Sequence, residues 1–316
     1  MSGVTSASSG PRVGFLGPEG TFTEQALLSQ PDLAACELVA LPSIPDVLTA
    51  VDSGEVDLGF IGIENSIEGA VTVTVDALAF EHDLFIQREV VLGVQVNLLA
   101  PSGVGLGDIR RVMSMPVATA QCRSFLHREL PGVESIAVSS TAEAARLVAG
   151  EEHDGHTAAI APSVAAKLYG LDVVANDIED HPDNATRFVV VSKSGIPAPT
   201  GHDKTSIVVF QRANRPGSLL AILQEFAARS IDLTKLESRP TKKGLGHYCF
   251  VIDLEGHVGD ELVADCLRDL KSKVADVKFL GSYPAVGEHA PARRREAEEA
   301  WREANVWVDS LRSQIT

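Results

Sequence analysis

Residues 84–99, Leu-Phe-Ile-Gln-Arg-Glu-Val-Val-Leu-Gly-Val-Gln-Val-Asn-Leu-Leu, form an apolar stretch that is too long for one ordinary β-strand. A chain that crosses from one α/β lobe to another would explain this length. The return crossing is expected near residues 184–191, Asn-Ala-Thr-Arg-Phe-Val-Val-Val. Both crossings would then line a cleft between two lobes. A single continuous sheet is the alternative.

Short apolar runs alternate with helix-like segments from residue 13 to about residue 193, and this alternation predicts parallel α/β layers. Further strands are expected at 13–16, 38–41, 58–63, 111–113, 135–138, 158–161, 173–175 and 187–191. Helices are expected at 23–29, 44–52, 74–80, 120–129, 141–148 and 163–169. Thr21 and Thr141 are expected to cap helices, and Glu24 stands at the capping-box spacing from Thr21.

A second unit follows a Pro- and Gly-rich linker at 195–204. Its strands are expected at 206–210, 233–238, 248–254 and 277–280, and its helices at 216–230 and 260–273. This βαββαβ order over residues 205–284 predicts a small ferredoxin-like domain. The charged tail, 285–316, is expected to contain an amphipathic helix at 293–311, with Trp301, Ala304, Val308 and Leu311 on one stripe.

The 316-residue chain is 45% hydrophobic, which is enough for a sizeable core and roughly two domains. Its formal net charge of -16 argues against nucleic acid or an anionic membrane as a partner. An anionic substrate would need a locally positive group, and Arg187 is the candidate. The sequence has no run of about twenty apolar residues, so no membrane span is expected.

The four cysteines, Cys36, Cys122, Cys249 and Cys266, lie far apart and have no spacing that suits zinc. We expect reduced thiols in a cytoplasmic protein that uses neither a metal nor a cofactor. The Ser- and Gly-rich residues 1–11 have no apolar core, so they are expected to be a disordered tail rather than a signal peptide.

Polar turns follow or precede several predicted strands: residues 17–24, residues 64–69, Ser114 with Gln121, and Thr186 with Arg187. Ligands bind at strand ends of α/β sheets. Arg187 offers a planar fork of donors to a carboxylate, and Thr186 offers a hydroxyl to a departing oxygen. Each turn taken singly is also compatible with an ordinary helix cap or surface ion pair. Together they predict a cleft that holds a polyanion and assists loss of a good leaving group.

These motifs, in this order, resemble those of prephenate dehydratase. The matching stretches are Gly17-Pro18-Glu19-Gly20-Thr21-Phe22-Thr23, Glu64-Asn65-Ser66-x-Glu68-Gly69, Ser114 to Gln121-Cys122, and Thr186-Arg187-Phe188. The family usually has His-Pro-Gln after the serine, whereas this chain has Met115-Pro116-Val117. The resemblance implies a catalytic domain over residues 12–194 with two lobes like those of periplasmic binding proteins.

The resemblance also implies a reaction, the conversion of prephenate to phenylpyruvate, water and carbon dioxide. It assigns catalytic roles to Thr186, Glu64, Asn65, Ser114 and Gln121. It assigns substrate binding to Gly20, Thr21, Ser66, Arg187 and Phe188. By this analogy Thr186 assists the leaving hydroxyl, with water or Glu64 as a proton source, and Arg187 with the Gly20 and Thr21 amides holds the substrate carboxylates. An arogenate dehydratase, a cytosolic sensor of an anionic metabolite and an amino-acid-responsive structural partner are the alternatives.

The second unit resembles an ACT domain, and two of its segments resemble phenylalanine-binding motifs. The residues implied in effector binding are Asn214, Pro216, Gly217, Ser218 and Leu219 in the first motif, and Glu237, Ser238, Arg239 and Pro240 in the second. Ser218 replaces the usual Ala, which would shift effector affinity or selectivity. The helix start at Gly217 suits a carboxylate, while Glu237 or Asn214 would meet the ammonium. Pairing of such units implies a homodimer or homotetramer.

Overall fold

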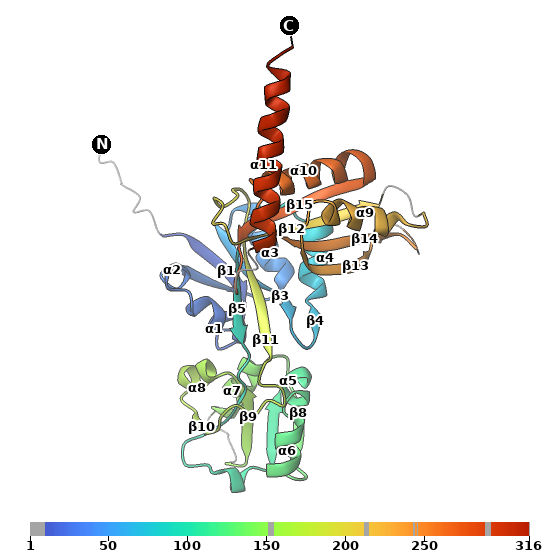
Figure 1. Ribbon diagram of the computed structural model, residues 1–316. Helices are drawn as coiled ribbons and strands as arrows, with labels where there is room; N and C mark the ends of the chain where they lie inside the picture. The colour runs from blue at the N-terminus through green and yellow to red at the C-terminus, as the bar shows by residue number, and fades with distance from the viewer. Residues whose placement is uncertain are drawn as a thin grey trace, which may run out of the picture. The chain divides into compact units, whose positions relative to one another are not determined.

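The structure is a computed structural model that describes residues 10–150, 155–211, 215–242, 244, 246–287 and 292–315 (Figure 1). The predicted disordered tail therefore lies, apart from its last two residues, outside the described residues. The chain divides into a first unit, residues 1–74 and 90–190, and a second unit, residues 75–89 and 191–316. The segment 75–89, which sequence analysis placed in the catalytic domain, thus packs with the C-terminal part of the chain.

The first lobe is built on a six-stranded sheet with the order β2-β1-β3-β11-β5, in which β4 also pairs with β3. Its strands are β1 (Arg12–Leu16), β2 (Glu37–Leu41), β3 (Leu58–Asn65), β4 (Gly69–Ala70), β5 (Phe85–Gly93) and β11 (Ala185–Ser192). Its helices are α1 (Phe22–Leu28), α2 (Pro31–Ala34), α3 (Ile44–Ser53) and α4 (Thr72–Phe80). β1 runs parallel to β2 and β3, and Phe60 stacks on Phe188 in the core.

The second lobe is built on a five-stranded sheet with the order β10-β6-β9-β7-β8. Its strands are β6 (Asn97–Ala100), β7 (Arg111–Ser114), β8 (Glu134–Ala137), β9 (Thr157–Ala161) and β10 (Asp172–Ala175). Its helices are the short 3₁₀ turn Leu106–Asp108, α5 (Pro116–Ala120), α6 (Arg123–Glu129), α7 (Thr141–Val148) and α8 (Ser163–Tyr169). β7 runs parallel to β8 and β9, but β6 runs antiparallel to β9 and β10. The predicted parallel pairing is present in both lobes, but the sheets are mixed, because β6, which enters from the first lobe, runs opposite to its neighbour β9.

The long apolar stretch crosses between the lobes, as predicted (Figure 1). Its first part is β5 in the first sheet, and its last part is β6 in the second sheet. The chain returns as β11, which lies between β3 and β5. The two-lobed arrangement is confirmed, and the alternative of one continuous sheet is wrong.

Two local predictions need correction. The cap of α7 is Ser140 rather than Thr141, since the Ser140 hydroxyl accepts the Glu143 amide at 3.0 Å. Hydrogen bonds from Ser139 to the Glu143 carboxylate lower the pKa of Glu143. The helix predicted at 120–129 begins only at Arg123, as α6, and the separate short helix α5 ends before it at its cap Gln121. The predicted cap at Thr21 is confirmed.

The second unit contains an antiparallel sheet with the order β13-β14-β12-β15. Its elements are β12 (Asp203–Gln211), α9 (Ser218–Ala227), β13 (Leu233–Pro240), β14 (Tyr248–Glu255), α10 (Glu261–Asp269), the π-helical turn Leu270–Val274 and β15 (Ala275–Pro284). The predicted βαββαβ order is confirmed. The C-terminal helix α11 (Ala292–Arg312) also forms, but Ala304 and Leu311 of its predicted stripe are exposed.

Residues 75–89 are fixed to the C-terminal sheet by charge and by close backbone packing. Lys204 Nζ on β12 lies 2.9 and 3.0 Å from the two carboxylate oxygens of Glu89, whose residue is only 2% exposed. The Val286 amide donates to the same carboxylate at 2.7 Å. On β15, Gly281 has no side chain, and a Cβ placed there would lie 2.4 Å from the Ile86 carbonyl oxygen.

We predict that Gly281→Ala lowers the free energy of unfolding of the second unit by about 2–3 kcal/mol, because a methyl group has to push the Ile86 backbone away. Chemical denaturation followed by circular dichroism measures this loss. Gly246→Ala is the matched control, since Gly246 also has a positive φ but nothing within 4 Å of the added carbon. It should lose only about 1 kcal/mol. Equal losses in the two variants would contradict a packing role for Gly281.

Candidate active site

The side chain of Asn65, at the end of β3, connects this strand to the start of β11. Its Nδ2 lies within hydrogen-bond distance of Asn184 Oδ1 (2.9 Å), Thr186 Oγ (3.0 Å) and the Ala185 carbonyl (3.2 Å). Its Oδ1 accepts the amides of Ile67 (2.9 Å) and Glu68 (3.0 Å). Because backbone amides can only donate, they determine which end of the Asn65 carboxamide faces Thr186. Asn65 therefore organises the 64–69 turn and presents its NH₂ group to β11.

The Thr186 hydroxyl is a hydrogen-bond acceptor toward Asn65. A threonine hydroxyl can accept and donate at the same time, so its own proton remains available for a third group. Thr186 is partly exposed at the start of β11, next to residues that are buried in the sheet. This geometry suits donation of a hydrogen bond to a bound molecule.

Arg187 and Glu64 form an ion pair between neighbouring strands, with Nη1 and Oε2 3.2 Å apart. The Arg187 side chain is 11% exposed and the Glu64 side chain 34%. The pair joins β11 to β3 within the first lobe. A carboxylate in an ion pair accepts hydrogen bonds, so this arrangement does not support Glu64 as a proton donor.

The next residue, Phe188, was predicted to contact substrate, but the structure places its side chain elsewhere. Phe188 is 3% exposed and stacks on Phe60 at a centroid distance of 5.3 Å. A side chain that is fully packed in the first-lobe core cannot contact a ligand without unfolding this core, so the prediction is corrected.

Gln121 brings the second lobe to the same place. Its Oε1 accepts the Asn184 Nδ2 at 3.1 Å, and its Nε2 donates to the Glu68 carboxylate at 3.3 Å. Ser66 adds a further contact, since its hydroxyl accepts the Ala185 amide at 2.9 Å. The predicted residues Asn65, Ser66, Gln121 and Thr186 therefore lie in one connected network.

Ser114 does not share in this network. The residue is fully buried, and its hydroxyl donates to the Ile160 carbonyl at 2.7 Å inside the second sheet. It lies at the wall of a cavity of about 480 Å³ that Thr119, Arg123 and His127 also line. The predicted catalytic role of Ser114 has no support in this geometry, because the hydroxyl proton is used within the sheet.

The turn at Gly20 and Thr21 uses its polar groups locally. The Thr21 hydroxyl accepts the Glu24 amide at 3.4 Å, and the Gly20 amide donates to the Glu24 carboxylate. The structure therefore does not present the Gly20 amide as an open donor for a substrate carboxylate. A Cβ on Gly20 would meet Leu168, Tyr169 and Ala142 at 3.3 to 3.4 Å, so the turn lies against the second lobe.

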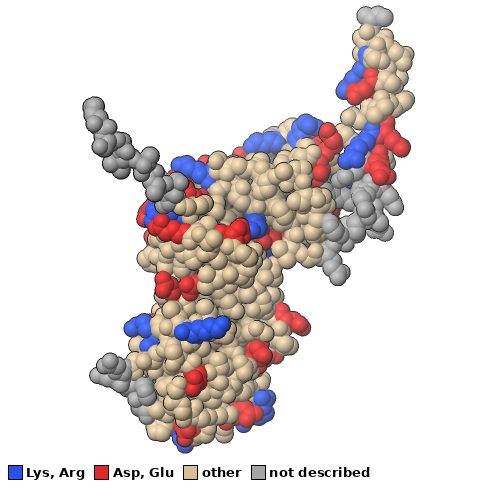
Figure 2. Space-filling view, turned by 90° about the vertical axis from the view of Figure 1, so that its left-hand side faces the viewer, with Lys and Arg blue, Asp and Glu red and all other residues tan. Residues whose placement is uncertain are grey.

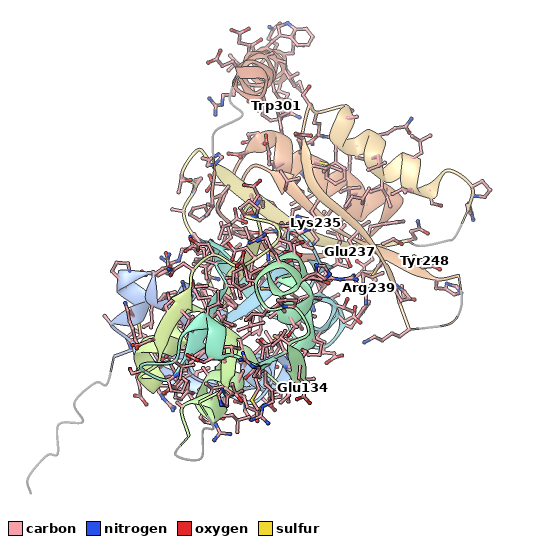
Figure 3. All side chains as sticks on the ribbon, turned by 90° about the horizontal axis from the view of Figure 1, so that it is seen from below. Glu134, Lys235, Glu237, Arg239, Tyr248 and Trp301 are labelled. Carbon is pink, nitrogen blue, oxygen red and sulfur yellow. The ribbon has the colours of Figure 1, made fainter. Side chains whose placement is uncertain are left out.

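In the second unit, β13 carries alternate residues Lys235, Glu237 and Arg239 on one side (Figure 3). Lys235 Nζ lies 3.6 Å and Arg239 Nη1 3.8 Å from the Glu237 carboxylate. Arg239 was predicted to bind an effector. Its Nε and Nη2 instead donate to Asp76 Oδ1 on α4 at 3.0 and 2.9 Å. The neighbouring Ser238 and Pro240 are exposed.

The other predicted effector motif leads into the first residues of α9. Asn214 lies outside the described residues. Pro216 and Gly217 are exposed, Gly217 has a φ of 82° as the cap of α9, and Leu219 is half-buried. The Ser218 hydroxyl donates to the Arg215 carbonyl at 2.8 Å. The hydroxyl that distinguishes Ser218 from alanine therefore closes a local turn.

The described residues contain neither a group of His, Cys, Asp and Glu suited to a metal ion nor a helix long and apolar enough to cross a membrane. All four cysteines are free, and burial raises the pKa of Cys122 and Cys266 to about 12 and that of Cys249 to about 11. These three thiols are therefore poor nucleophiles. On the face drawn in Figure 2, acidic and basic side chains are interspersed rather than separated by sign.

Asn184 and Asp76 take part in these contacts, although sequence analysis gave neither residue a role. Asn184 was quoted with the strand entrance but received no role, although it is 1% exposed and bonds both Asn65 and Gln121. Asp76 was assigned to a helix and nothing more. Their partners are 63 to 163 residues away in sequence, so no local pattern identifies them.

Comparisons with known proteins agree on one family. The family model described as prephenate dehydratase matches residues 13–195, and the ACT domain model matches residues 205–272. A prephenate dehydratase from Mycobacterium marinum is 41% identical over 313 residues, which cover 95% of this chain and 96% of the relative. The crystal structure of prephenate dehydratase from Arthrobacter aurescens in complex with L-Phe has a TM-score of 0.88 and 40% identity, and the match covers 96% and 99% of the two chains.

A structure described as GqqA, a novel type of quorum quenching acylase, is more distant. It has 28% identity and a TM-score of 0.78, and the match covers 87% of this chain and 98% of that one. The more similar relatives therefore carry the assignment.

We predict that Asn65→Asp lowers the free energy of unfolding by about 2–4 kcal/mol, because a carboxylate would face three oxygens that now accept from an NH₂ group. Thermal and urea unfolding measure the change. Ser66→Ala is the comparison, since it removes one hydroxyl that accepts the Ala185 amide, and it should lose about 1 kcal/mol. If Asn65→Asp is no less stable than Ser66→Ala, the carboxamide does not hold the two strands together.

Proposed function

We propose that this chain, which belongs to the prephenate dehydratase family of lyases and carries an ACT domain, uses the Thr186 hydroxyl to assist loss of water from prephenate. The single observation that supports this most is the 3.0 Å hydrogen bond from Asn65 Nδ2 to Thr186 Oγ. It makes the hydroxyl an acceptor toward the protein and leaves its proton for the substrate. The site works as a positioned set of neutral donors and acceptors.

The reaction breaks two bonds of the substrate ring. The bond from the ring to its carboxylate breaks and releases carbon dioxide, and the electron pair enters the ring. On the opposite side, the carbon–oxygen bond breaks, and the oxygen takes a proton and leaves as water. The ring becomes aromatic, and this gain supplies most of the driving force. The protein therefore has to hold the substrate and place one proton.

Threonine is too weak an acid to give up its proton for good at neutral pH. The Thr186 hydrogen bond would stabilise the developing negative charge on the leaving oxygen, and water would supply the net proton. The ion pair with Arg187 argues against Glu64 as this proton source. Glu64 instead holds the Arg187 guanidinium in position near the start of β11.

Arg187 is our candidate for a substrate carboxylate, because guanidinium binds carboxylate with matched geometry. Ser66, and Gln121 through the second hydrogen of its NH₂ group, would position the remaining substrate oxygens. The Thr21 hydroxyl already caps α1, so it is not included. Ser114, Phe188 and the Gly20 amide are left out of this set, since each is used inside the protein. The description of the relatives as prephenate dehydratases supports prephenate rather than arogenate as the substrate of this chain. Relative rates on the two substrates test this proposal.

We also propose that phenylalanine binds the second unit through the segments around Gly217–Leu219 and Glu237–Pro240, in a cytoplasmic homodimer or homotetramer. The related enzyme from Arthrobacter aurescens that was crystallised with L-Phe supports the effector. The start of α9 offers amides to a carboxylate, and the Glu237 carboxylate offers an acceptor to an ammonium group.

Arg239 is proposed to transmit effector binding rather than to contact the effector. It belongs to the second motif but bonds Asp76 on α4. Two residues earlier on the same helix, the Thr74 hydroxyl donates to the Gly62 carbonyl of β3 at 2.6 Å. Gly62 precedes Glu64 and Asn65 on that strand. A change at Arg239 would thus reach the active-site strand through one continuous helix.

Thr186→Ala should lower kcat for prephenate about 100-fold or more and change KM by only about threefold, because the hydroxyl acts mainly in the transition state. Formation of phenylpyruvate, followed by its absorbance, gives both constants. Thr186→Ser keeps the hydroxyl and should retain most of the activity. Unchanged kcat in the alanine variant would remove Thr186 from the mechanism.

Asp76→Asn should raise the phenylalanine concentration for half inhibition about fivefold, which corresponds to about 1 kcal/mol of coupling. The uninhibited kcat/KM should stay within about twofold of the parent value. Asp83→Asn is the matched control in the same segment, because Asp83 is 94% exposed and pairs with Lys278 instead of Arg239. An unchanged half-inhibition concentration in Asp76→Asn would contradict the proposed route.

A further inference from the structure

Asn184 is a buried carboxamide at the point where the two crossings and the two lobes meet. It is 1% exposed. Its backbone carbonyl accepts the Val94 amide of the first crossing at 2.7 Å. Its side chain accepts from Asn65 in the first lobe at 2.9 Å and donates to Gln121 in the second lobe at 3.1 Å. Both ends of the side chain are therefore used, each toward a different lobe.

These contacts form a series of hydrogen bonds in which the orientation of each carboxamide must match that of its neighbour. The Glu68 carboxylate can only accept, so Gln121 turns its NH₂ toward Glu68 and its oxygen toward Asn184. Asn184 then turns its NH₂ toward Gln121 and its oxygen toward Asn65. Asn65 in turn donates to the Thr186 hydroxyl. Reversal of any one carboxamide would set two donors or two acceptors against each other.

We infer that Asn184 is a positioning residue for the dehydration. The amides of Ile67 and Glu68 set which end of the Asn65 carboxamide faces β11, and Asn184 holds that NH₂ group in place so that Thr186 accepts from it and directs its own proton to the leaving oxygen. Asn184 touches no reacting atom in this account, and it acts through Asn65 and Thr186. The inference rests on the proposed role of Thr186. It assigns a function in the reaction to a residue whose burial would otherwise suggest only a part in the core.

The variant Asn184→Asp tests for a role in the reaction, because a purely structural role predicts no pH-dependent recovery of kcat. The neutral carboxylic acid has one donor and one acceptor, so it can replace the asparagine toward Gln121 and Asn65. The ionised carboxylate has no donor and would oppose the Gln121 oxygen. Activity of Asn184→Asp should therefore depend on protonation of the new group, and burial favours the neutral form.

The experiment measures kcat and KM for prephenate from pH 5.5 to 8.5, at temperatures where circular dichroism shows each variant to be folded. Asn184→Asp should lose between about tenfold and a hundredfold in kcat at pH 8, with little change in KM. Relative to the parent, kcat should recover as the pH falls. Asn97→Asp is the matched control, because Asn97 is also a buried asparagine, 4% exposed, but its side chain accepts from Asp177 in the second lobe. It should show no such recovery.

A double-mutant cycle with Thr186→Ala separates this inference from the proposed function. In the Thr186→Ala background, Asn184→Asp should change kcat by less than about threefold, since the group through which it acts is gone. An undiminished effect there, a change confined to KM, or an absence of acid recovery would each overturn the role of Asn184. Full activity of Thr186→Ala alone, or no prephenate turnover by the parent protein, would instead overturn the proposed function.

Discussion

The structure depends on two passes of one chain between two lobes, and these passes are bonded to each other. The Val94 amide of the first pass donates to the Asn184 carbonyl of the second. Beside this junction, Gln121 of the second lobe bonds the Asn184 side chain and Glu68 of the first lobe. Because β11 lies between β3 and β5, the returning chain necessarily places Asn184, Thr186 and Arg187 beside the end of β3. The site is thus a consequence of how the chain returns.

A second constraint joins regulation to the same strands. Residues 75–89, which contain most of α4 and the first half of β5, belong to the unit that contains the C-terminal sheet. The buried Glu89 carboxylate requires Lys204, since an unpaired buried charge would be costly. Gly281 allows the backbones of β15 and β5 to approach closely. The C-terminal sheet therefore contacts the parts of α4 and β5 that continue into the first-lobe sheet, which supports the proposed route of an effector signal through α4.

Sequence reasoning reached the features that depend on pattern and length. The length of residues 84–99 predicted a crossing between two lobes, and strand–helix alternation predicted their α/β layers. It failed where the outcome depends on a partner far away in sequence. Ser114 and Phe188 have polar-turn and motif positions, yet the sheet and the core take up their side chains. Arg239 lies in an effector-like motif, but Asp76, 163 residues earlier, binds it. The Ser140 cap was missed although Ser140, unlike Thr141, has a carboxylate at the capping-box spacing, Glu143.

The chemistry of the network suits an acidic protein that binds an anion. Arg187, the proposed carboxylate ligand, is held by the Glu64 carboxylate, and the side chains that connect the two lobes beside it are mostly neutral. Carboxamides bind oxygen atoms without adding charge, and their two ends are different, so a chain of them transmits orientation. A reaction driven by aromatisation needs little acid strength from the protein. It needs one hydroxyl proton that points at the leaving oxygen. In the proposed mechanism the Asn65 carboxamide, held by the amides of Ile67 and Glu68 and by Asn184, gives the Thr186 proton this direction.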